Sequence, residues 1–236
     1  MQNIVAEIKR KPELRDLPDK LVEDAVSSYL KKQRIQIPRS PQSRKVIVKE
    51  IRAQLRSLTG QYKFNSSSKR ISEIIESGDF SQMLNLHKST KERTNDYEFI
   101  KKIISYLNPK SVLDLGCGLN PLALATDKIF YHAYEIKSED LEIIKSFFEK
   151  NNISGDTHHA DIRTVSNFPE VDLCLMFKLL DILGSKKSEI AEDLIKKINS
   201  KYFIVSFATR TLSGKPMNRP YRRWFENILK ELNYSY

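Results

Sequence analysis

The amino-acid sequence predicts an α/β fold in which a helical, basic domain precedes a doubly wound parallel sheet. Three observations support this prediction. From about residue 94, apolar runs alternate with amphipathic helical patterns, which is typical of parallel strands buried on both faces. One of these runs ends in a glycine loop, LGCG at 115–118. The net charge of +10 belongs to residues 1–70, which contain 17 Lys and Arg against 7 Asp and Glu, whereas residues 71–236 contain 23 of each.

The first domain begins with two amphipathic helical patterns. LPDKLVEDAVSSYLKKQ covers residues 17–33, and KVIVKEIRAQLRSLTGQY covers 45–62. Pro38 and Pro41 interrupt the pattern between them, and Ser43 is placed to cap the second helix. Five basic residues fall largely outside the apolar stripe of this helix and are the expected RNA-binding residues: Arg44, Lys45, Lys49, Arg52 and Arg56. A solvated basic surface is the plainer alternative.

The expected domains are residues 1–80, basic and helical, and residues 81–236, which hold the sheet. An amphipathic helix at 96–107 leads into the second domain. The expected strands are SVLDLGC (111–117), KIFYHAYEI (128–136), the stretch around THHAD (157–161), VDLCLMF (171–177) and KYFIVSF (201–207). The expected helices are SEDLEIIKSFFEKN (138–151), SEIAEDLIKKIN (188–199) and RPYRRWFENILKEL (219–232). A sixth strand would only begin at 233–236, so we expect either that the sheet lacks its C-terminal strands or that the chain is shortened.

Composition argues against several classes of protein. No stretch approaches the ~18 consecutive apolar residues of a membrane-spanning helix. The N-terminal MQNIVAEIKRKPELRD carries acids and lacks the apolar segment of a signal peptide. The two cysteines, Cys117 and Cys174, do not suggest a disulfide framework, and no Cys/His spacing fits zinc. We therefore expect a cytoplasmic protein with no membrane partner and no metal.

The glycine loop raises the question of its ligand. Gly116 and Gly118 let a ligand approach the backbone closely, and Asn120 can cap a helix that starts at Pro121. A dinucleotide-binding loop would need a third glycine where this chain has Pro121. The acid at Asp114 would repel a pyrophosphate, but it can bond, often through water, to the ammonium group of an amino acid. S-adenosylmethionine has such a group and no phosphate.

Acids at the ends of the next two strands fit the same ligand. Glu135, at the end of the second strand, can accept both ribose hydroxyls. Asp161, at the end of the third, can bind the adenine amino group with Ile162 beside it, and Phe177 can flank the ring. The arrangement resembles the class I S-adenosylmethionine-dependent methyltransferases. A structural turn acid at Asp114 and a solvated loop acid at Glu135 are the alternative interpretation.

The reaction is narrowed by what the sequence lacks. Methylation of an exocyclic amine on a base commonly uses an Asn/Asp-Pro-Pro-aromatic turn after the fourth strand, where this chain reads FKLLDIL (177–183). Methylation of pyrimidine C5 needs a nucleophilic cysteine, and neither Cys117 nor Cys174 is well placed for that role. A ring nitrogen with a free lone pair, such as guanine N7, remains, and it needs positioning but no general base. The expected target-positioning residues are Lys178, Arg210 and Lys215.

Four segments together resemble one family. LHKSTKER (86–93), VLDLGCGLNPLALA (112–125), YHAYEI (131–136) and VSFATRTLSGK (205–215) are similar to the aminoglycoside-resistance 16S rRNA methyltransferases of the Arm/Rmt group. These enzymes methylate guanine N7 at position 1405, in the decoding-site helix of the small subunit. The resemblance implies a cofactor site made of Tyr62, His87, Ser89, Arg93, Gly116, Glu135, Asp161, Ile162 and Phe177. Within this site Arg93 would pair with the methionine carboxylate.

Two departures from the family lie at the lip of the target pocket. Asp181 stands where a proline is common, and Lys186 where a glutamine is common. The leading hypothesis is an rRNA guanine-N7 methyltransferase that acts as a monomer on assembled 30S subunits and protects ribosomes from aminoglycosides. The alternatives are a related methyltransferase of another RNA site and a non-catalytic protein that binds S-adenosylmethionine or the ribosome. A small-molecule methyltransferase would not explain the basic first domain.

Overall fold

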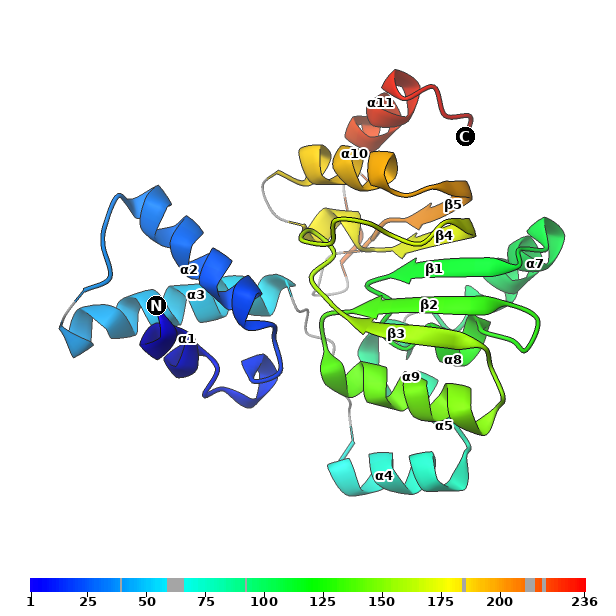
Figure 1. Cartoon of the computed structure of the whole chain (residues 1–236), viewed down its shortest axis with the longest axis horizontal. Coiled ribbons are helices and arrows are strands. Elements are labelled where there is room, and N and C mark those ends of the chain that lie inside the picture. The colour runs from blue at the N-terminus through cyan, green and yellow to red at the C-terminus, as the bar shows by residue number, and fades with distance from the viewer. Residues whose placement is uncertain (39, 59–65, 92, 184–185, 211–214, 218–219) are drawn as a thin grey trace.

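A computed structural model shows a group of helices followed by a parallel sheet with helices on both faces (Figure 1). The structure describes all residues except 39, 59–65, 92, 184–185, 211–214 and 218–219. It also does not describe the side chains of residues 57, 58, 68, 88 and 89. The elements before the sheet are α1 (Gln2–Ile8), the 3-10 helix η1 (Pro12–Leu14), α2 (Asp19–Gln33), α3 (Pro41–Leu58), α4 (Ser68–Ser77), α5 (Ser81–Leu86), α6 (Lys88–Lys91) and α7 (Tyr97–Leu107).

The sheet has the strand order β3-β2-β1-β4-β5, and all four strand pairings are parallel. Its elements are β1 (Ser111–Leu115), α8 (Pro121–Leu124), β2 (Phe130–Glu135), α9 (Ser138–Lys150), β3 (Gly155–His159), β4 (Val171–Phe177), η2 (Leu180–Ile182), α10 (Lys187–Lys197), β5 (Ser200–Ser206) and α11 (Arg223–Glu231). The strand order reverses between β1 and β4, and in open α/β sheets this point forms a ligand crevice at the carboxyl ends. The predicted doubly wound fold is confirmed.

Alternate residues of β1 serve opposite faces of the sheet. Val112 belongs to the apolar cluster that the sheet forms with α4, α5, α7, α8 and α9. Leu113 belongs to the cluster formed with α10 and α11. Both side chains are fully buried, as expected for a strand that lies between two others with helices on either side. No helix of the described residues is long and apolar enough to span a membrane.

Helices α1, α2 and α3 pack on one another around an apolar cluster of their own, which runs from Ile4 to Leu55. Figure 1 shows this bundle beside the sheet. Ile136, just after β2, packs against the same cluster and so joins the bundle to the carboxyl end of the sheet. By contrast, α4, α5 and the turn between them contribute Ile74, Met83 and Phe80, respectively, to the sheet's cluster. The predicted division at residue 80 stays a prediction, and this packing favours a division before α4.

The sequence placed most elements within a few residues of their observed bounds. One correction concerns the start of α3, which begins at Pro41 rather than after Ser43. Ser40 supplies the capping oxygen, because its hydroxyl accepts from the Ser43 amide at 3.2 Å. A proline is tolerated in the first turn because its missing N–H would have no partner there. The two-turn helix α1 was not predicted.

Candidate active site

The glycine loop after β1 has the conformation that its sequence requires. Gly116 and Gly118 have φ values of +61° and +50°, which L-residues rarely adopt. A Cβ at Gly116 would lie 2.8 Å from Cδ1 of Leu179, so the loop also passes close to the segment after β4. The Cys117 amide donates to the Tyr134 carbonyl at 3.1 Å, which ties the loop to β2.

A pocket opens beside this loop at the carboxyl ends of the strands. Nine of the predicted site residues line it: His87, Arg93, Gly116, Gly118, Glu135, Asp161, Ile162, Phe177 and Lys178. His87 and Arg93 come from the segment before β1, whereas the others lie at or just after the carboxyl ends of β1 to β4, which the parallel arrangement brings together. Three charged lining residues were not predicted, namely Lys137, Asp140 and Arg163.

Glu135 is held by backbone amides on both sides of its carboxylate. Its Oε2 accepts from the Gly118 amide at 2.8 Å, and Oε1 accepts from the Ile136 amide at 2.7 Å and the Lys137 amide at 3.2 Å. Burial raises the pKa of this carboxyl, and the nearby Asp140 adds to the increase. The contact across the loop fixes the acid against the glycines, so the side chain is preorganised before a ligand arrives.

Asp161 forms a two-pronged ion pair with Arg163. Arg163 Nε lies 2.9 Å from Oδ1, and Nη2 lies 2.6 Å from Oδ2. Both residues line the pocket, and Asp161 is 7% exposed. An adenine amino group at Asp161 would therefore share the carboxylate with Arg163. In the sequence, the only sign of this ion pair is that Arg163 follows Asp161 by two residues.

A buried polar network lies beneath the glycine loop. Arg93 Nη1 donates to Asn120 Oδ1 at 2.6 Å, and Asn120 Nδ2 donates to Asp114 Oδ2 at 3.2 Å. The Tyr131 hydroxyl donates to the same oxygen of Asp114 at 2.8 Å. Asn120 is thus turned into this network and does not cap α8 with its side chain, contrary to the sequence prediction. Burial raises the pKa of Asp114 to about 7.

His87 faces Asp140 across the pocket wall. Its Nε2 lies 3.6 Å from Asp140 Oδ2, and both side chains are almost fully buried. Burial lowers the pKa of His87 to about 4, and the positive charge of Lys137 contributes to the same direction. Burial raises the pKa of Asp140 to about 6. The histidine is therefore neutral at physiological pH and contributes hydrogen-bonding capacity rather than charge.

The segment after β4 forms another part of the pocket wall, next to the glycine loop. Lys178 has a φ of +53°, an uncommon conformation for a residue other than glycine, and its amide donates to the Ser206 carbonyl at 2.9 Å. This turn directs the chain into η2 next to the end of β5. Unusual backbone conformations of this kind persist where the surrounding structure enforces them, often at functional sites.

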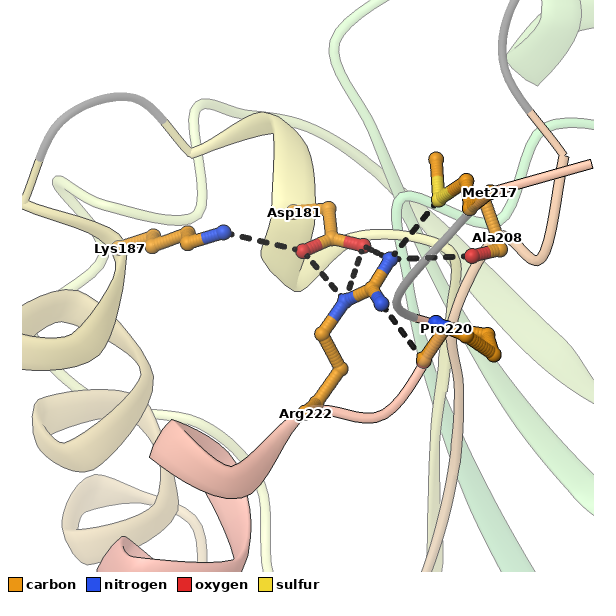
Figure 2. A network of polar contacts seen from close by, with 6 residues as sticks. All are labelled: Asp181, Lys187, Ala208, Met217, Pro220 and Arg222. Atoms are coloured by element: carbon orange, nitrogen blue, oxygen red, sulfur yellow. Dashed lines mark hydrogen bonds and ion pairs between the residues drawn. The ribbon is translucent and has the colours of Figure 1, made fainter.

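Asp181 and Arg222 form a partly buried clamp between the segments that follow β4 and β5 (Figure 2). Arg222 Nε and Nη2 lie 2.9 and 2.6 Å from Asp181 Oδ2, and Lys187 Nζ lies 3.2 Å from Oδ1. Arg222 also donates to the carbonyls of Ala208 at 3.0 Å and Pro220 at 2.6 Å. Burial alone would raise the pKa of Asp181, but the bonds from Arg222 and Lys187 outweigh it and lower this pKa.

Comparison with known proteins places the chain in a family. The model described as ribosomal RNA methyltransferase (FmrO) matches residues 71–236. A 16S rRNA (guanine(1405)-N(7))-methyltransferase of Serratia marcescens is 33% identical over 191 residues, which cover 79% of this chain and 76% of that protein. The chain belongs to the FmrO family of ribosomal RNA methyltransferases.

Solved structures agree with this membership. The 16S rRNA methylase RmtB aligns with a TM-score of 0.76 at 26% identity, over 96% of this chain and 88% of that one. The 16S rRNA methyltransferase RmtF in complex with S-adenosyl-L-homocysteine aligns with a TM-score of 0.80 at 23% identity, over 96% and 88% of the two chains, and shows the same fold. The predicted class, an S-adenosylmethionine-dependent rRNA methyltransferase on a class I fold, is confirmed.

Five predicted site residues of this FmrO-family chain do not line the pocket or lie outside the residues that the structure describes. Asp114 lies behind the glycine loop, in the buried network, rather than on the pocket wall. Arg210 and Lys215 are exposed on the segment after β5 and are not among the described lining residues. Tyr62 and the Ser89 side chain lie outside the described residues. Their predicted roles stay predictions.

The five basic residues predicted to bind RNA differ in their surroundings. Lys45 and Lys49 are exposed on α3, while Arg44 is half-buried. Arg52 donates to the carbonyls of Glu7 and Ile8 at the end of α1, and Arg56 forms an ion pair with Glu13 at 2.8 Å. These last two arginines therefore hold the bundle together, a role that local sequence patterns do not reveal.

The two cysteines of the chain are fully buried. Burial raises the pKa of both the Cys117 and the Cys174 thiols well above the usual value. Because the thiolate is the nucleophilic form, neither side chain suits the covalent chemistry of pyrimidine C5 methylation. This supports the sequence-based exclusion of that reaction.

Proposed function

We propose that this chain transfers a methyl group from S-adenosylmethionine to N7 of guanine 1405 in 16S rRNA, the activity named for its Serratia marcescens relative. The observation that carries the proposal is the pocket itself. In a chain of the FmrO family, it joins a glycine loop, an amide-bound acid at Glu135 and an apolar wall at Phe177. The RmtF chain, which shares this fold, binds the demethylated form of the same cofactor.

The described residues fit S-adenosylmethionine. Among these residues, Arg93 Nε and Asp114 Oδ1 are buried atoms without a hydrogen-bond partner, a state that is costly unless a ligand or water supplies one. Arg93 would hold the methionine carboxylate, and Asp114 would reach the ammonium group through water. Glu135 lines the pocket, and Oε2, which accepts only the Gly118 amide, has a lone pair left to accept a ribose hydroxyl. Ile162 and Phe177 supply the apolar surfaces for adenine.

The chemistry requires positioning rather than proton transfer. S-adenosylmethionine supplies a methyl group on a positively charged sulfur. Guanine N7 has a lone pair and no proton, so the nitrogen gains the methyl group and the sulfur becomes neutral without a general base. Holding the two groups in line can supply ~7–11 kcal/mol of the barrier. Lys178, on the pocket wall that follows β4, would orient the base, and the Asp181–Arg222 clamp would hold this wall in place.

The basic bundle would dock the enzyme on the 30S subunit in the cytoplasm, with the enzyme acting as a monomer. Ile136 supports this arrangement because it lines the pocket and also packs against the bundle cluster. A surface that binds phosphates near the pocket would recognise a folded rRNA shape. The exposed Lys45 and Lys49, together with Arg210 and Lys215, are the residues proposed to contact the rRNA. Methylation of the decoding site would then confer aminoglycoside resistance.

The decisive experiment offers the protein purified 30S subunits and, separately, naked 16S rRNA, with methyl-labelled S-adenosylmethionine. We expect label on 30S subunits and little on naked rRNA, and N7-specific strand cleavage should map it to guanine 1405. Label at another nucleotide would support the related methyltransferase of a different site. A protein that binds the cofactor or the subunit but transfers no methyl group would support the non-catalytic alternative.

A further inference from the structure

One face of the sheet is left partly uncovered. Its apolar cluster joins the strands to α10 and α11, which lie on the β5 side of the sheet in Figure 1, with β3 at the opposite edge. The chain passes from β3 to β4 through residues 160–170 without forming a helix. Ile162 and Phe168 of this segment pack on the face together with Tyr134 of β2. Polar side chains lie beside them on β2 and β3: His132 from β2, and Asp156 and His158 from β3.

The strand register brings these three side chains together. His132 and Asp156 are direct partners in the parallel pair, and His158 lies two residues further along β3, on the same face. His132 Nδ1 lies 2.8 Å from Asp156 Oδ1, and His158 Nε2 lies 2.9 Å from the same oxygen. The three potential ligand atoms all lie within 4.8 Å of one another. The side chains of Asp156 and His158 are 43% and 38% exposed, so an ion can reach them from solvent.

We propose that His132, Asp156 and His158 form a binding site for a divalent transition metal ion of the Zn²⁺ type. Two imidazoles and one carboxylate are ligands that such ions prefer, and three protein ligands leave a position for water. Metal–ligand bonds of ~2.0–2.2 Å place ligand atoms ~3.3–3.6 Å apart, so small rotations from the observed separations suffice. A carboxylate only accepts hydrogen bonds, so both ring nitrogens now donate to Asp156. When the ion binds, each of these N–H protons would pass to solvent or to the other nitrogen of the same ring, and the freed lone pair would bind the ion.

Neighbouring aromatic rings hold the two imidazoles in place. The Tyr134 ring stacks on His158 with centroids 4.2 Å apart and an angle of 16° between the planes. The Phe130 ring lies 4.8 Å from the His132 ring. Rings that are already ordered lose less conformational freedom when they bind an ion. These contacts distinguish the group from freely rotating surface histidines.

This site is separate from the methyl-transfer pocket, because none of its three residues is among the described lining residues. A metal ion there would tie the edge strand β3 to β2. These two strands lead to Glu135 and Asp161, the acids proposed to bind the cofactor. We therefore expect the ion to stabilise the fold around the cofactor site rather than to take part in the reaction. The sequence predicts no metal because its Cys/His spacing does not fit zinc, and the ligands meet only through strand pairing.

The test titrates the chelator-treated protein with Zn²⁺ by calorimetry, and with Co²⁺ by visible absorption. We expect one equivalent to bind, Co²⁺ to give the intense bands of a four- or five-coordinate site, and Zn²⁺ to raise the Tm. His132→Ala and His158→Ala should each weaken binding at least tenfold and abolish the Tm shift. Asp156→Asn, which keeps the size of the side chain, should weaken binding while the protein stays folded.

His159→Ala is the matched control, because it removes an adjacent histidine whose ring bonds to the Ile136 carbonyl at 3.0 Å, outside the group. This variant should bind Zn²⁺ like the unchanged chain. Absence of stoichiometric binding would overturn the proposal, as would binding that survives both His132→Ala and His158→Ala or that disappears with His159→Ala alone. Methyl transfer to 30S subunits is measured separately, so the result does not depend on the proposed function.

Discussion

The two walls of the pocket are built in different ways. On the wall proposed to bind the cofactor, here the cofactor wall, backbone amides and buried groups dominate: the Gly118 amide binds Glu135, and Arg93 reaches Asp114 through Asn120. Next to the segment proposed to face the target base, here the acceptor wall, Asp181 and Arg222 join two segments through side-chain charges that remain partly exposed. The cofactor wall therefore depends on the strands and the loop between them, whereas the acceptor wall depends on a long-range ion pair.

The largest effect is expected on the cofactor wall, from Arg93→Ala. Loss of a charge-assisted hydrogen bond to the methionine carboxylate, worth ~1.5–3 kcal/mol, should weaken S-adenosylmethionine binding about 10- to 100-fold. Calorimetry measures the affinity, and sedimentation with 30S subunits should show that ribosome binding survives. Arg93→Lys is the matched control, since it keeps the positive charge but loses the parallel N–H donors of the guanidinium group. An unchanged cofactor affinity in a folded Arg93→Ala protein would remove this residue from the site.

The next largest effect is expected on the acceptor wall. Arg222→Ala should lower kcat/KM for 30S subunits about tenfold, while the Kd for S-adenosylmethionine changes less than about twofold, because the clamp would position the acceptor only. The double variant Asp181→Asn/Arg222→Gln should lower kcat/KM by less than the combined effect of its two single changes. Removing only one partner of a partly buried ion pair leaves the other charge uncompensated. Steady-state kinetics and cofactor titration check both expectations.

Lys187→Ala serves as the control for the clamp. Lys187 contacts Asp181 through a longer bond and is more exposed than Arg222, so its removal should have a smaller effect. A parallel loss of cofactor and 30S affinity in Arg222→Ala would show that the two walls are not independent.

A smaller effect is expected for the docking surface. Lys45→Gln/Lys49→Gln should weaken 30S binding a few-fold and reduce the slope of log K against log salt by ~0.7–0.9 for each lost phosphate contact. Arg56→Gln offers a comparison on the same helix, because Arg56 is paired with Glu13 and its loss should lower the Tm. Binding of 30S subunits across a salt series gives the slopes. Equal slopes for the unchanged chain and the double lysine variant would contradict a docking role for α3.

The last expectation concerns stability rather than binding or turnover, at Asp114 in the buried network beneath the glycine loop. Burial raises the pKa of Asp114 from 3.8 to about 7, so the folded state favours its protonated form. Its contribution to stability is fully present below the unfolded pKa and is lost as pH rises through about 7. The unfolding free energy of the cofactor-free protein should therefore decline over this range relative to that of Asp114→Asn. Urea titrations at several pH values measure the difference, and identical pH profiles would refute the assignment.

His87 makes the unfolding free energy rise with pH, whereas Asp114 makes it fall. The pH profile of the unchanged chain is therefore compared with that of Asp114→Asn. Its pKa is lowered from 6.5 to about 4, and its contribution is present above 6.5 and lost as pH falls toward 4. Because the Asp114→Asn protein retains His87, this contribution cancels in the difference.

The sequence by itself predicted the family, which the comparisons confirm, and most of the residues that line the pocket beside the glycine loop. Parallel strands present their carboxyl ends at one edge, so the glycine loop, Glu135 and Asp161 could be placed together from the order of strands alone. The glycines also define their own local backbone, because few other residues adopt their φ values. These features depend on neighbours in the chain or on the general rules of α/β sheets.

The tertiary structure decided which polar side chains pair. It turned Asn120 into a buried network, placed Arg163 on Asp161 and used Arg52 to tie α1 to α3. It also joined Asp181 to Arg222 and brought His132 beside Asp156. Each of these contacts depends on strand register, helix packing or side-chain direction between distant segments. A local pattern of apolar and charged residues carries no information about those quantities.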